Sequence, residues 1–246
     1  MRNNHGLLHT HVNTKTGHWY REHEDIGVGG QIDSFYEYLY KAWALFGDEE
    51  YFSMWDEVYN SISEKLRCPD THLFFDFSLQ GGLSKKAQSL SCFFPGLEAH
   101  WGKVERANQT VHTLFKVWQE NQFMPEIFQK EINPLGEVTF RPLLQEYPLR
   151  PEFVESIYFL YRKTKDKELL NMAVEVVKSL RKTKEKCGYA AVYRTSPSIV
   201  LRDRMDSFFL SETLKYLYLI FDDENVFNHL PGVVFNTEAH IFFKDI

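Results

Sequence analysis

The sequence has little cysteine, no excess of positive charge and no long hydrophobic run, and each absence excludes a class of protein. Its three cysteines, Cys68, Cys92 and Cys187, have neither zinc-site nor redox-pair spacing, and their disulfide pairing is left open. The formal net charge is -6 and no Lys/Arg tract occurs, so we do not expect a nucleic acid partner. No apolar run approaches a membrane span, and none follows the first residues, so we expect neither a transmembrane helix nor a signal peptide in this chain.

What the chain does contain is a large share of aromatic residues, 16%, many of them at helical spacing. This spacing predicts helices over residues 33–46, 49–66, 104–118, 153–161, 169–180 and 207–221. Short links join the first two helices and the fourth to the fifth, which predicts antiparallel helical hairpins. We therefore expect an all-α protein with a single domain over 1–246. Such hairpins can stack as a solenoid or close into an (α/α) toroid, and periodicity does not choose between them.

The segments between these helices have weaker patterns. We predict a strand or hairpin followed by a glycine-rich turn in residues 7–30, and strands at 72–77, 187–193 and 233–242. Pro95-Gly96 is expected to break an apolar run, and Pro125-Glu126 to begin a helix or turn. The acidic run Asp222-Asp223-Glu224 lacks the ligand spacing of an EF-hand and is expected to be a solvated helix end.

The stretch 147–156 is organised as a loop that turns into a helix. Arg150 precedes a proline and should be extended, and Pro151 suits the first helical position. Glu152 and Glu155 then share one face of the first turn, where the helix dipole would hold a carboxylate ionised. A fixed carboxylate beside an arginine suits a general base or a sugar-binding group. An acidic helix start is also common in any helical protein, and spacing alone favours that interpretation.

Five stretches, taken together and in order, resemble the class I α-1,2-mannosidases of glycoside hydrolase family 47. They are Gly-Val-Gly-Gly-Gln-Ile-Asp-Ser-Phe-Tyr-Glu-Tyr (27–38), Phe-Phe-Pro-Gly (93–96), Leu-Arg-Pro-Glu-Phe-Val-Glu-Ser (149–156), Asp-Arg-Met-Asp-Ser-Phe-Phe-Leu-Ser-Glu-Thr-Leu-Lys-Tyr-Leu-Tyr-Leu (203–219) and Phe-Asn-Thr-Glu-Ala-His (235–240). Lys186-Cys187-Gly188-Tyr189 and Asp33-Ser34-Phe35-Tyr36-Glu37 are most similar to the ER degradation-enhancing α-mannosidase-like branch. The resemblance covers essentially the whole chain.

This resemblance implies an (α/α)7 toroid with short β-hairpins that removes α-1,2-linked mannose from high-mannose N-glycans, with inversion and with bound Ca²⁺. The implied substrates are misfolded glycoproteins marked for ER-associated degradation, and the implied location is the ER lumen. A lumenal oxidoreductase similar to protein disulfide isomerase is a further implied partner. An inverting glycosidase needs two carboxyl groups about 6.5–9.5 Å apart, so that a water fits between the base and the sugar.

By resemblance, each site residue receives a role. The catalytic carboxyl groups are Glu152, as general base, and Asp33, beside the attacked sugar. Arg150 and Glu155 would orient the sugar or the catalytic carboxylate, and Asp206 and Glu238 would hold the water shell or sugar hydroxyls. Thr237 would bind calcium through its hydroxyl and carbonyl oxygens, the hard ligands that Ca²⁺ prefers.

The sequence departs from the family pattern in three ways. Asp206 stands where the family carries a glutamate, and Gln31 stands where trimming members carry an arginine. The family domain is also longer, and its N-terminal portion, with a Phe-Glu motif that carries a catalytic acid, lies outside the match. The alternative is therefore a non-hydrolytic, mannose-binding adaptor in the same pathway. A helical scaffold with a decayed site is a third interpretation, which the retained site residues argue against.

Overall fold

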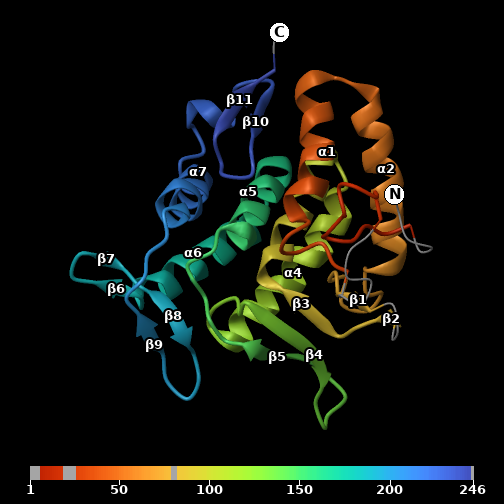
Figure 1. The fold of residues 1–246 in the computed structure, drawn as a ribbon. Coiled ribbons are helices and arrows are strands. Elements are labelled where there is room, and N and C mark those ends of the chain that lie inside the picture. The colour runs from red at the N-terminus through yellow and green to blue at the C-terminus, as the bar shows by residue number, and fades with distance from the viewer. Residues whose placement is uncertain (1–5, 19–25, 79–81, 245–246) are drawn as a thin grey trace. The chain divides into compact units, whose positions relative to one another are not determined.

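The computed structural model describes residues 6–18, 26–78 and 82–244, and this part of the chain is mainly helical (Figure 1). The chain divides into two compact units. Unit 1 comprises Met1–Ala87 and Gly232–Ile246, and unit 2 comprises Gln88–Pro231. In the described ranges no helix is both long and apolar enough to cross a membrane. The single domain over 1–246 stays a prediction.

Unit 1 is built on a helical hairpin of α1 (Asp33–Phe46) and α2 (Glu49–Lys65), as predicted (Figure 1). Gly47 ends α1 in the left-handed conformation with φ 71°, and its N–H donates to the Trp43 carbonyl. The Asp48 side chain caps α2 by accepting from the Glu50 N–H. Aromatic rings join the helices: the ring centroids of Tyr40 and Trp55 lie 5.7 Å apart.

The strands of unit 1 are short. β1 (Phe77–Ser78) pairs with β2 (Gly82–Leu83), β10 (Val233–Phe235) pairs with β11 (Ile241–Phe243), and β10 contacts α1. The strand predicted over 72–77 is wrong, because only an isolated bridge at Phe74 and the first residue of β1 have strand pairing. The single strand predicted over 233–242 is also wrong, because a turn at 236–240 folds it into a hairpin.

The strand or hairpin predicted in residues 7–30 lies partly outside the described residues, at 19–25. Where the chain is described, Asn13 and His18 close a turn, and Ile26 forms an isolated bridge with Phe77. The glycine-rich turn before α1 is present. A Cβ on Gly27 would lie too close to Asp76 Oδ1, so a side chain at this position would require the Asp76 carboxylate to move.

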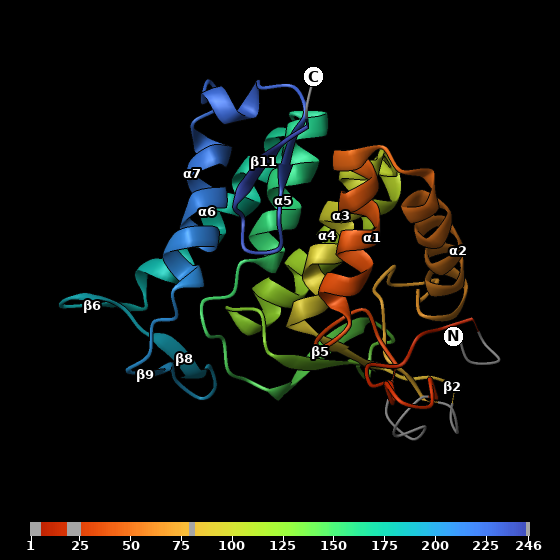
Figure 2. The same cartoon turned by 45° about the horizontal axis from the view of Figure 1, so that its top comes forward.

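Unit 2 is organised around one helix, α5 (Glu152–Thr164), which contacts all four other α-helices of the unit (Figure 2). These are α3 (Phe94–Trp101), α4 (Val104–Asn121), α6 (Lys167–Arg181) and α7 (Lys215–Phe221). Short helices flank them: η1 (Ser89–Phe93), the π-helix η2 (Phe209–Leu214) and η3 (Val226–Asn228). Val154, Ile157 and Leu160 of α5 are fully buried, so this helix forms the centre of the core of unit 2.

α3 and α5 approach each other closely at one glycine. A Cβ on Gly96 would lie 3.0 Å from the Ser156 Cα, and the Gly96 N–H donates to the Ser156 hydroxyl across 2.8 Å. That hydroxyl donates in turn to the Cys92 carbonyl. Pro95-Gly96 therefore lies in the first turn of α3, and the predicted break at this position is wrong.

Three antiparallel hairpins complete unit 2. They are β4 (Ile127–Ile132) with β5 (Val138–Leu144), β6 (Lys184–Glu185) with β7 (Gly188–Tyr189), and β8 (Ala191–Arg194) with β9 (Val200–Arg202). The predicted strand at 187–193 is divided between β7 and β8. The β4–β5 hairpin was not predicted. Glu126 lies in a bend directly before β4, so of the predicted helix or turn at Pro125-Glu126 the helix is wrong. A remaining strand, β3 (Lys86–Gln88), includes the boundary between the units.

Candidate active site

The loop before α5 is fixed at each step, which sets the position of Arg150 and Glu152. Tyr147 exchanges both backbone hydrogen bonds with Val192, at 2.8 and 2.9 Å, and its hydroxyl donates to the Arg150 carbonyl at 3.1 Å. Leu149 adopts φ 65°, a strained conformation for a branched residue, and its carbonyl accepts from the Thr213 hydroxyl at 2.7 Å. Pro151 caps the helix and Glu152 is its first residue, as the sequence predicted to within one position.

Arg150 is held by a carboxylate that sequence reasoning did not select. Its Nε donates to Glu126 Oε1 at 2.5 Å and its Nη2 donates to Oε2 at 2.7 Å, which makes a bidentate pair. The Ser89 hydroxyl also donates to Glu126 Oε1 at 2.8 Å. The only sequence signal for Glu126 was its preceding proline, and no local pattern relates residues 24 positions apart.

Glu152 receives no comparable support. The nearest approach of Arg150 is 3.9 Å, from Nη1 to Glu152 Oε1, and Oε2 is buried without a hydrogen-bond partner among the described residues. The Glu152 side chain is 15% exposed. Burial raises its pKa to about 8, while Arg150 and a hydrogen bond from the backbone N–H of Glu152 itself offset part of that rise. The expectation that the helix start holds Glu152 ionised is therefore wrong, because desolvation outweighs the dipole.

The other predicted site residues of unit 2 lie around this pair. Glu155 is buried in α5, and the Tyr216 hydroxyl donates to it at 3.5 Å. Asp206 precedes η2 and is paired with Arg204, whose Nε donates to Asp206 Oδ1 at 3.1 Å. The charge of Asp206 contributes to the electrostatic environment of Arg150.

Unit 1 holds the remaining predicted residues. Asp33 is the first residue of α1 and accepts from the Ser34 N–H at 2.9 Å. The Ser34 hydroxyl lies 3.4 Å from the Thr237 hydroxyl, so the start of α1 and the turn between β10 and β11 come together. The Thr237 N–H donates to the Tyr38 hydroxyl at 3.3 Å, and Glu238 is exposed in the same turn.

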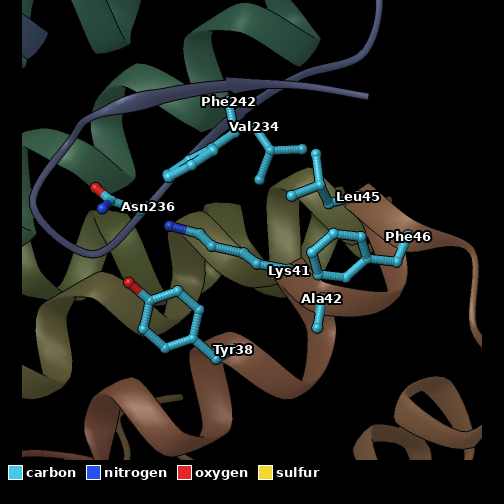
Figure 3. Close-up of a pocket in the computed structure, with 8 residues that line it drawn as sticks. All are labelled: Tyr38, Lys41, Ala42, Leu45, Phe46, Val234, Asn236 and Phe242. Atoms are coloured by element: carbon cyan, nitrogen blue, oxygen red, sulfur yellow. The ribbon is translucent and has the colours of Figure 1, made fainter. Parts of the chain in front are cut away.

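An apolar pocket of about 210 Å³ lies beside this turn (Figure 3). Residues of α1 and of the β10–β11 hairpin line it: Tyr38, Lys41, Ala42, Leu45, Phe46, Val234, Asn236 and Phe242. In Figure 3 the Lys41 amine and the Tyr38 hydroxyl point toward Asn236. The Lys41 amine is itself paired with the buried Glu37 carboxylate. The pocket therefore offers mainly aliphatic and aromatic surface.

The Thr237 turn offers oxygen donors of the kind that Ca²⁺ prefers. The Thr237 and Ser34 hydroxyls are neighbouring hard oxygen donors, which suit Ca²⁺ better than a transition metal. Among the described residues no group of three His, Cys, Asp or Glu side chains could hold a metal. A calcium ion here would thus rely on hydroxyl, carbonyl and water oxygens, as the resemblance implies for Thr237.

Curated relatives match nearly all of this chain. It is 37% identical to "Alpha-mannosidase I MNS4" of Arabidopsis thaliana over 98% of its own length and 38% of that protein. It is 37% identical to the Homo sapiens "ER degradation-enhancing alpha-mannosidase-like protein 3" over 96% of its length and 24% of that protein. It is 39% identical to the Saccharomyces cerevisiae "ER degradation-enhancing alpha-mannosidase-like protein 1" over 87% of its length and 28% of that protein. The chain thus spans less than half the length of these relatives.

The fold also matches a solved structure. An α-1,2-mannosidase from Trichoderma reesei superposes with a TM-score of 0.83 at 24% identity, over 98% of this chain and 56% of that chain. This likeness confirms the predicted fold class, part of an (α/α)7 toroid made of helical hairpins. The model of glycosyl hydrolase family 47 matches residues 1–244. The resemblance seen in the sequence is thereby confirmed, and the chain belongs to glycosyl hydrolase family 47.

Proposed function

We propose that this chain carries the site of an inverting, calcium-dependent α-1,2-mannosidase that trims high-mannose N-glycans. The observation that supports this most is the Glu152 carboxyl, which has one buried oxygen without a hydrogen bond beside a fixed guanidinium. An oxygen that no protein donor occupies can accept a proton from a water that reaches it when a substrate binds. The misfolded glycoproteins of ER-associated degradation, in the ER lumen, are the proposed substrates, as the names of the relatives suggest.

Glu152 would act as the general base, and only its ionised form can do so. With a pKa of about 8, roughly a tenth of it is ionised at pH 7. Asp33 would be the second catalytic carboxyl group and would protonate the departing sugar oxygen while Glu152 takes the proton of the attacking water. Arg150 and Glu155 would orient the sugar or the catalytic carboxylate, and Asp206 and Glu238 would hold the water shell or sugar hydroxyls. Calcium bound at Thr237 would supply positive charge and coordination for sugar hydroxyls.

The test is hydrolysis of a Manα1-2Man disaccharide and of a high-mannose N-glycan by the purified chain. We expect mannose to be released as the β-anomer in proton NMR spectra, because inversion requires it. Replacing Glu152 by Gln should lower kcat by about 10²- to 10⁴-fold, while Glu105→Gln, which removes an exposed carboxylate in the first turn of α4, should leave kcat unchanged. Retained trimming by the Glu152 variant would exclude this residue as the base.

The calcium proposal has its own test, which does not depend on turnover. Isothermal titration with CaCl₂ should show binding that Thr237→Ala weakens by about tenfold or more. The exposed threonine Thr14 offers a control, and Thr14→Ala should bind as the unchanged chain does. Equal calcium affinity in all three proteins would rule out the Thr237 site.

A second candidate, the mannose-binding adaptor, is favoured by the same Glu152 carboxyl. At neutral pH it is mostly protonated, and a neutral carboxyl can donate a hydrogen bond to a sugar hydroxyl without abstracting a proton. A binder would hold Manα1-2Man in titration calorimetry and release no mannose at any pH. A mannosidase would release it increasingly as the pH rises toward 8. For either function we also propose a lumenal oxidoreductase as partner, and Cys187 is the exposed free cysteine available to it.

A further inference from the structure

Glu126 is anchored through both its backbone and its carboxylate. Its N–H donates to the Glu146 carbonyl at 2.9 Å, and its own carbonyl accepts from the Ser89 N–H at 3.0 Å. Its carboxylate then accepts three hydrogen bonds, two from Arg150 and one from the Ser89 hydroxyl. Backbone and side chain of Glu126 are thus both fixed, and they fix the guanidinium in turn.

The Arg150 guanidinium interacts with two carboxyl groups, closely with Glu126 and only at long range with Glu152. Glu126 takes the Nε and Nη2 edge, while Nη1 stays 3.9 Å from Glu152, beyond hydrogen-bond reach. The Phe208 ring lies 6.0 Å from the Arg150 Cζ, within the range of a cation–π contact. The three charged side chains are only 15% to 22% exposed, so a bare carboxylate here gains little from water.

We propose that Glu126 is a positioning residue: with Ser89, it holds the Arg150 guanidinium in an orientation that leaves only a long ion pair with Glu152 and prevents a hydrogen bond between them. This inference rests on the proposed function, because it assigns Glu126 a task in preparing the base. The Glu126 carboxylate is not placed on the sugar or on the attacking water. It acts through Arg150.

The charged groups that act on Glu152 come from the loop before α5, from α5 itself and from the segment before β4. Arg150 favours its charged form, whereas Glu126 and Glu155 favour its neutral form. Cys92 of η1 and Tyr147 of the preceding loop also face it, and burial keeps both in their neutral forms by raising their pKa values. Arg150 is therefore the one cation in this set. Burial raises the pKa of Glu152 most, and the distance of Arg150 from Glu152 sets how much of that rise is offset.

The direct test is a titration of Glu152 by carbon NMR of labelled glutamate, with its signal assigned from Glu152→Gln. Glu126→Gln keeps the side-chain volume but replaces one acceptor oxygen by a donor, so it cannot take the bidentate pair. Released from Glu126, Arg150 should pair with Glu152 and lower its titration midpoint by about 1 to 3 pH units. An unchanged midpoint in this variant would overturn the proposal.

Loss of the Glu126 charge also lowers the midpoint directly, so a double-mutant cycle must separate the two causes. In the Arg150→Gln background there is no guanidinium to move. Glu126→Gln should then shift the Glu152 midpoint by less than half as much as it does in the unchanged chain. Equal shifts in both backgrounds would show that Glu126 acts by its charge alone, and the positioning role would be wrong.

Two milder variants keep the proposal testable should Glu126→Gln fail to fold. Ser89→Ala keeps the Glu126 charge and removes one hydrogen bond from it. We expect a smaller shift in the same direction, which charge loss cannot produce, whereas no shift or a rise would contradict the proposal. Glu126→Asp, which keeps the charge, should shift the titration midpoint of Glu152 less than Glu126→Gln does. An equal shift would contradict the positioning role of Glu126.

An activity measurement separates this inference from the proposed function. If the chain hydrolyses Manα1-2Man, the acidic limb of its pH–rate profile should move in Glu126→Gln by the same amount as the NMR midpoint. A moved NMR midpoint without any hydrolysis would support the positioning role and refute the mannosidase proposal. Hydrolysis with an unmoved midpoint would support the mannosidase and refute the positioning role.

Discussion

The two units hold their candidate site residues by different physical means. In unit 2, Arg150, Glu126 and Glu152 are partly buried charges, and a bidentate ion pair with several hydrogen bonds fixes two of them. In unit 1, Thr237 and Glu238 lie in a hairpin turn that Asn236 closes with its own side chain. A buried charge network depends on all its members, whereas a turn depends mainly on its backbone, so substitutions in the two places should differ in cost.

The largest loss of stability is expected from Arg150→Met in unit 2. It leaves Glu126 and Glu152 without their cation, and loss of one partner from a buried pair costs about 3–5 kcal/mol. Partial exposure and protonation of the carboxyls should reduce this to about 2–3 kcal/mol in chemical denaturation. The control Arg141→Met breaks an exposed pair with Glu131 in the β4–β5 hairpin and should cost about 1 kcal/mol or less. If Arg150→Met and Arg141→Met lost equal stability, burial would not make the Arg150 ion pair more important than the exposed pair.

The pH dependence of folding stability should show that the Glu152 carboxyl is the group of this network that burial destabilises in its ionised form. Its pKa is raised from 4.5 to about 8 in the folded chain. As pH rises through this window the unfolded state releases its proton first, so this carboxyl lowers folding stability progressively and fully above pH 8.

Glu152→Gln lacks this penalty. Its stability relative to the unchanged chain should therefore increase from pH 5 to pH 8 by about 2–5 kcal/mol and then stay constant. Differential scanning calorimetry at pH 5, 7 and 9 measures this. The matched exposed carboxyl, in Glu105→Gln, should give a difference that is flat with pH. A flat difference for Glu152→Gln as well would mean that its carboxyl is not desolvated.

Packing in unit 2 should be sensitive at the contact between α3 and α5. Gly96→Ala places a Cβ 3.0 Å from the Ser156 Cα, and because the obstacle includes backbone, we expect a loss of about 1–3 kcal/mol. Ser156→Ala removes the hydroxyl bridge but adds no atom, and should cost about 1–2 kcal/mol. Urea unfolding measures both. A neutral Gly96→Ala would show that the two helices can move apart freely.

The smallest effect is expected in unit 1, at the turn that holds Thr237. Asn236 Oδ1 accepts from the Glu238 N–H at 3.0 Å and the His240 N–H at 2.8 Å. Asn236→Ala removes both bonds at an exposed turn, which should cost about 0.5–1.5 kcal/mol in thermal unfolding. Glu238→Ala keeps both N–H donors and should be close to neutral. If Asn236→Ala lost as much stability as Arg150→Met, the turn in unit 1 and the charge network in unit 2 would not differ in their sensitivity to substitution.

The predictions from sequence were accurate where a repeat of 3.6 residues carried the signal. The hairpins α1–α2 and α5–α6 and the helix α4 lie where periodicity placed them. The errors lie where structure depends on partners distant in sequence. The pairing of β4 with β5 leaves no helical period in the sequence. Pro95-Gly96 looks like a break of an apolar run in the sequence, whereas in the structure Gly96 lies in α3 and its N–H donates to the Ser156 hydroxyl of α5.

The sequence by itself determined the family, the helical hairpins and the identity of the candidate residues, because local periodicity and ordered motifs are written in neighbouring positions. Only the tertiary structure decided how those residues behave. It brought Glu126 to Arg150 across 24 positions, and it buried Glu152 enough to raise its pKa to about 8. The physical reason is that desolvation and ion pairing depend on which segments pack together. The residues next to a carboxylate at a helix start therefore do not show how deeply it is buried or which cation lies beside it.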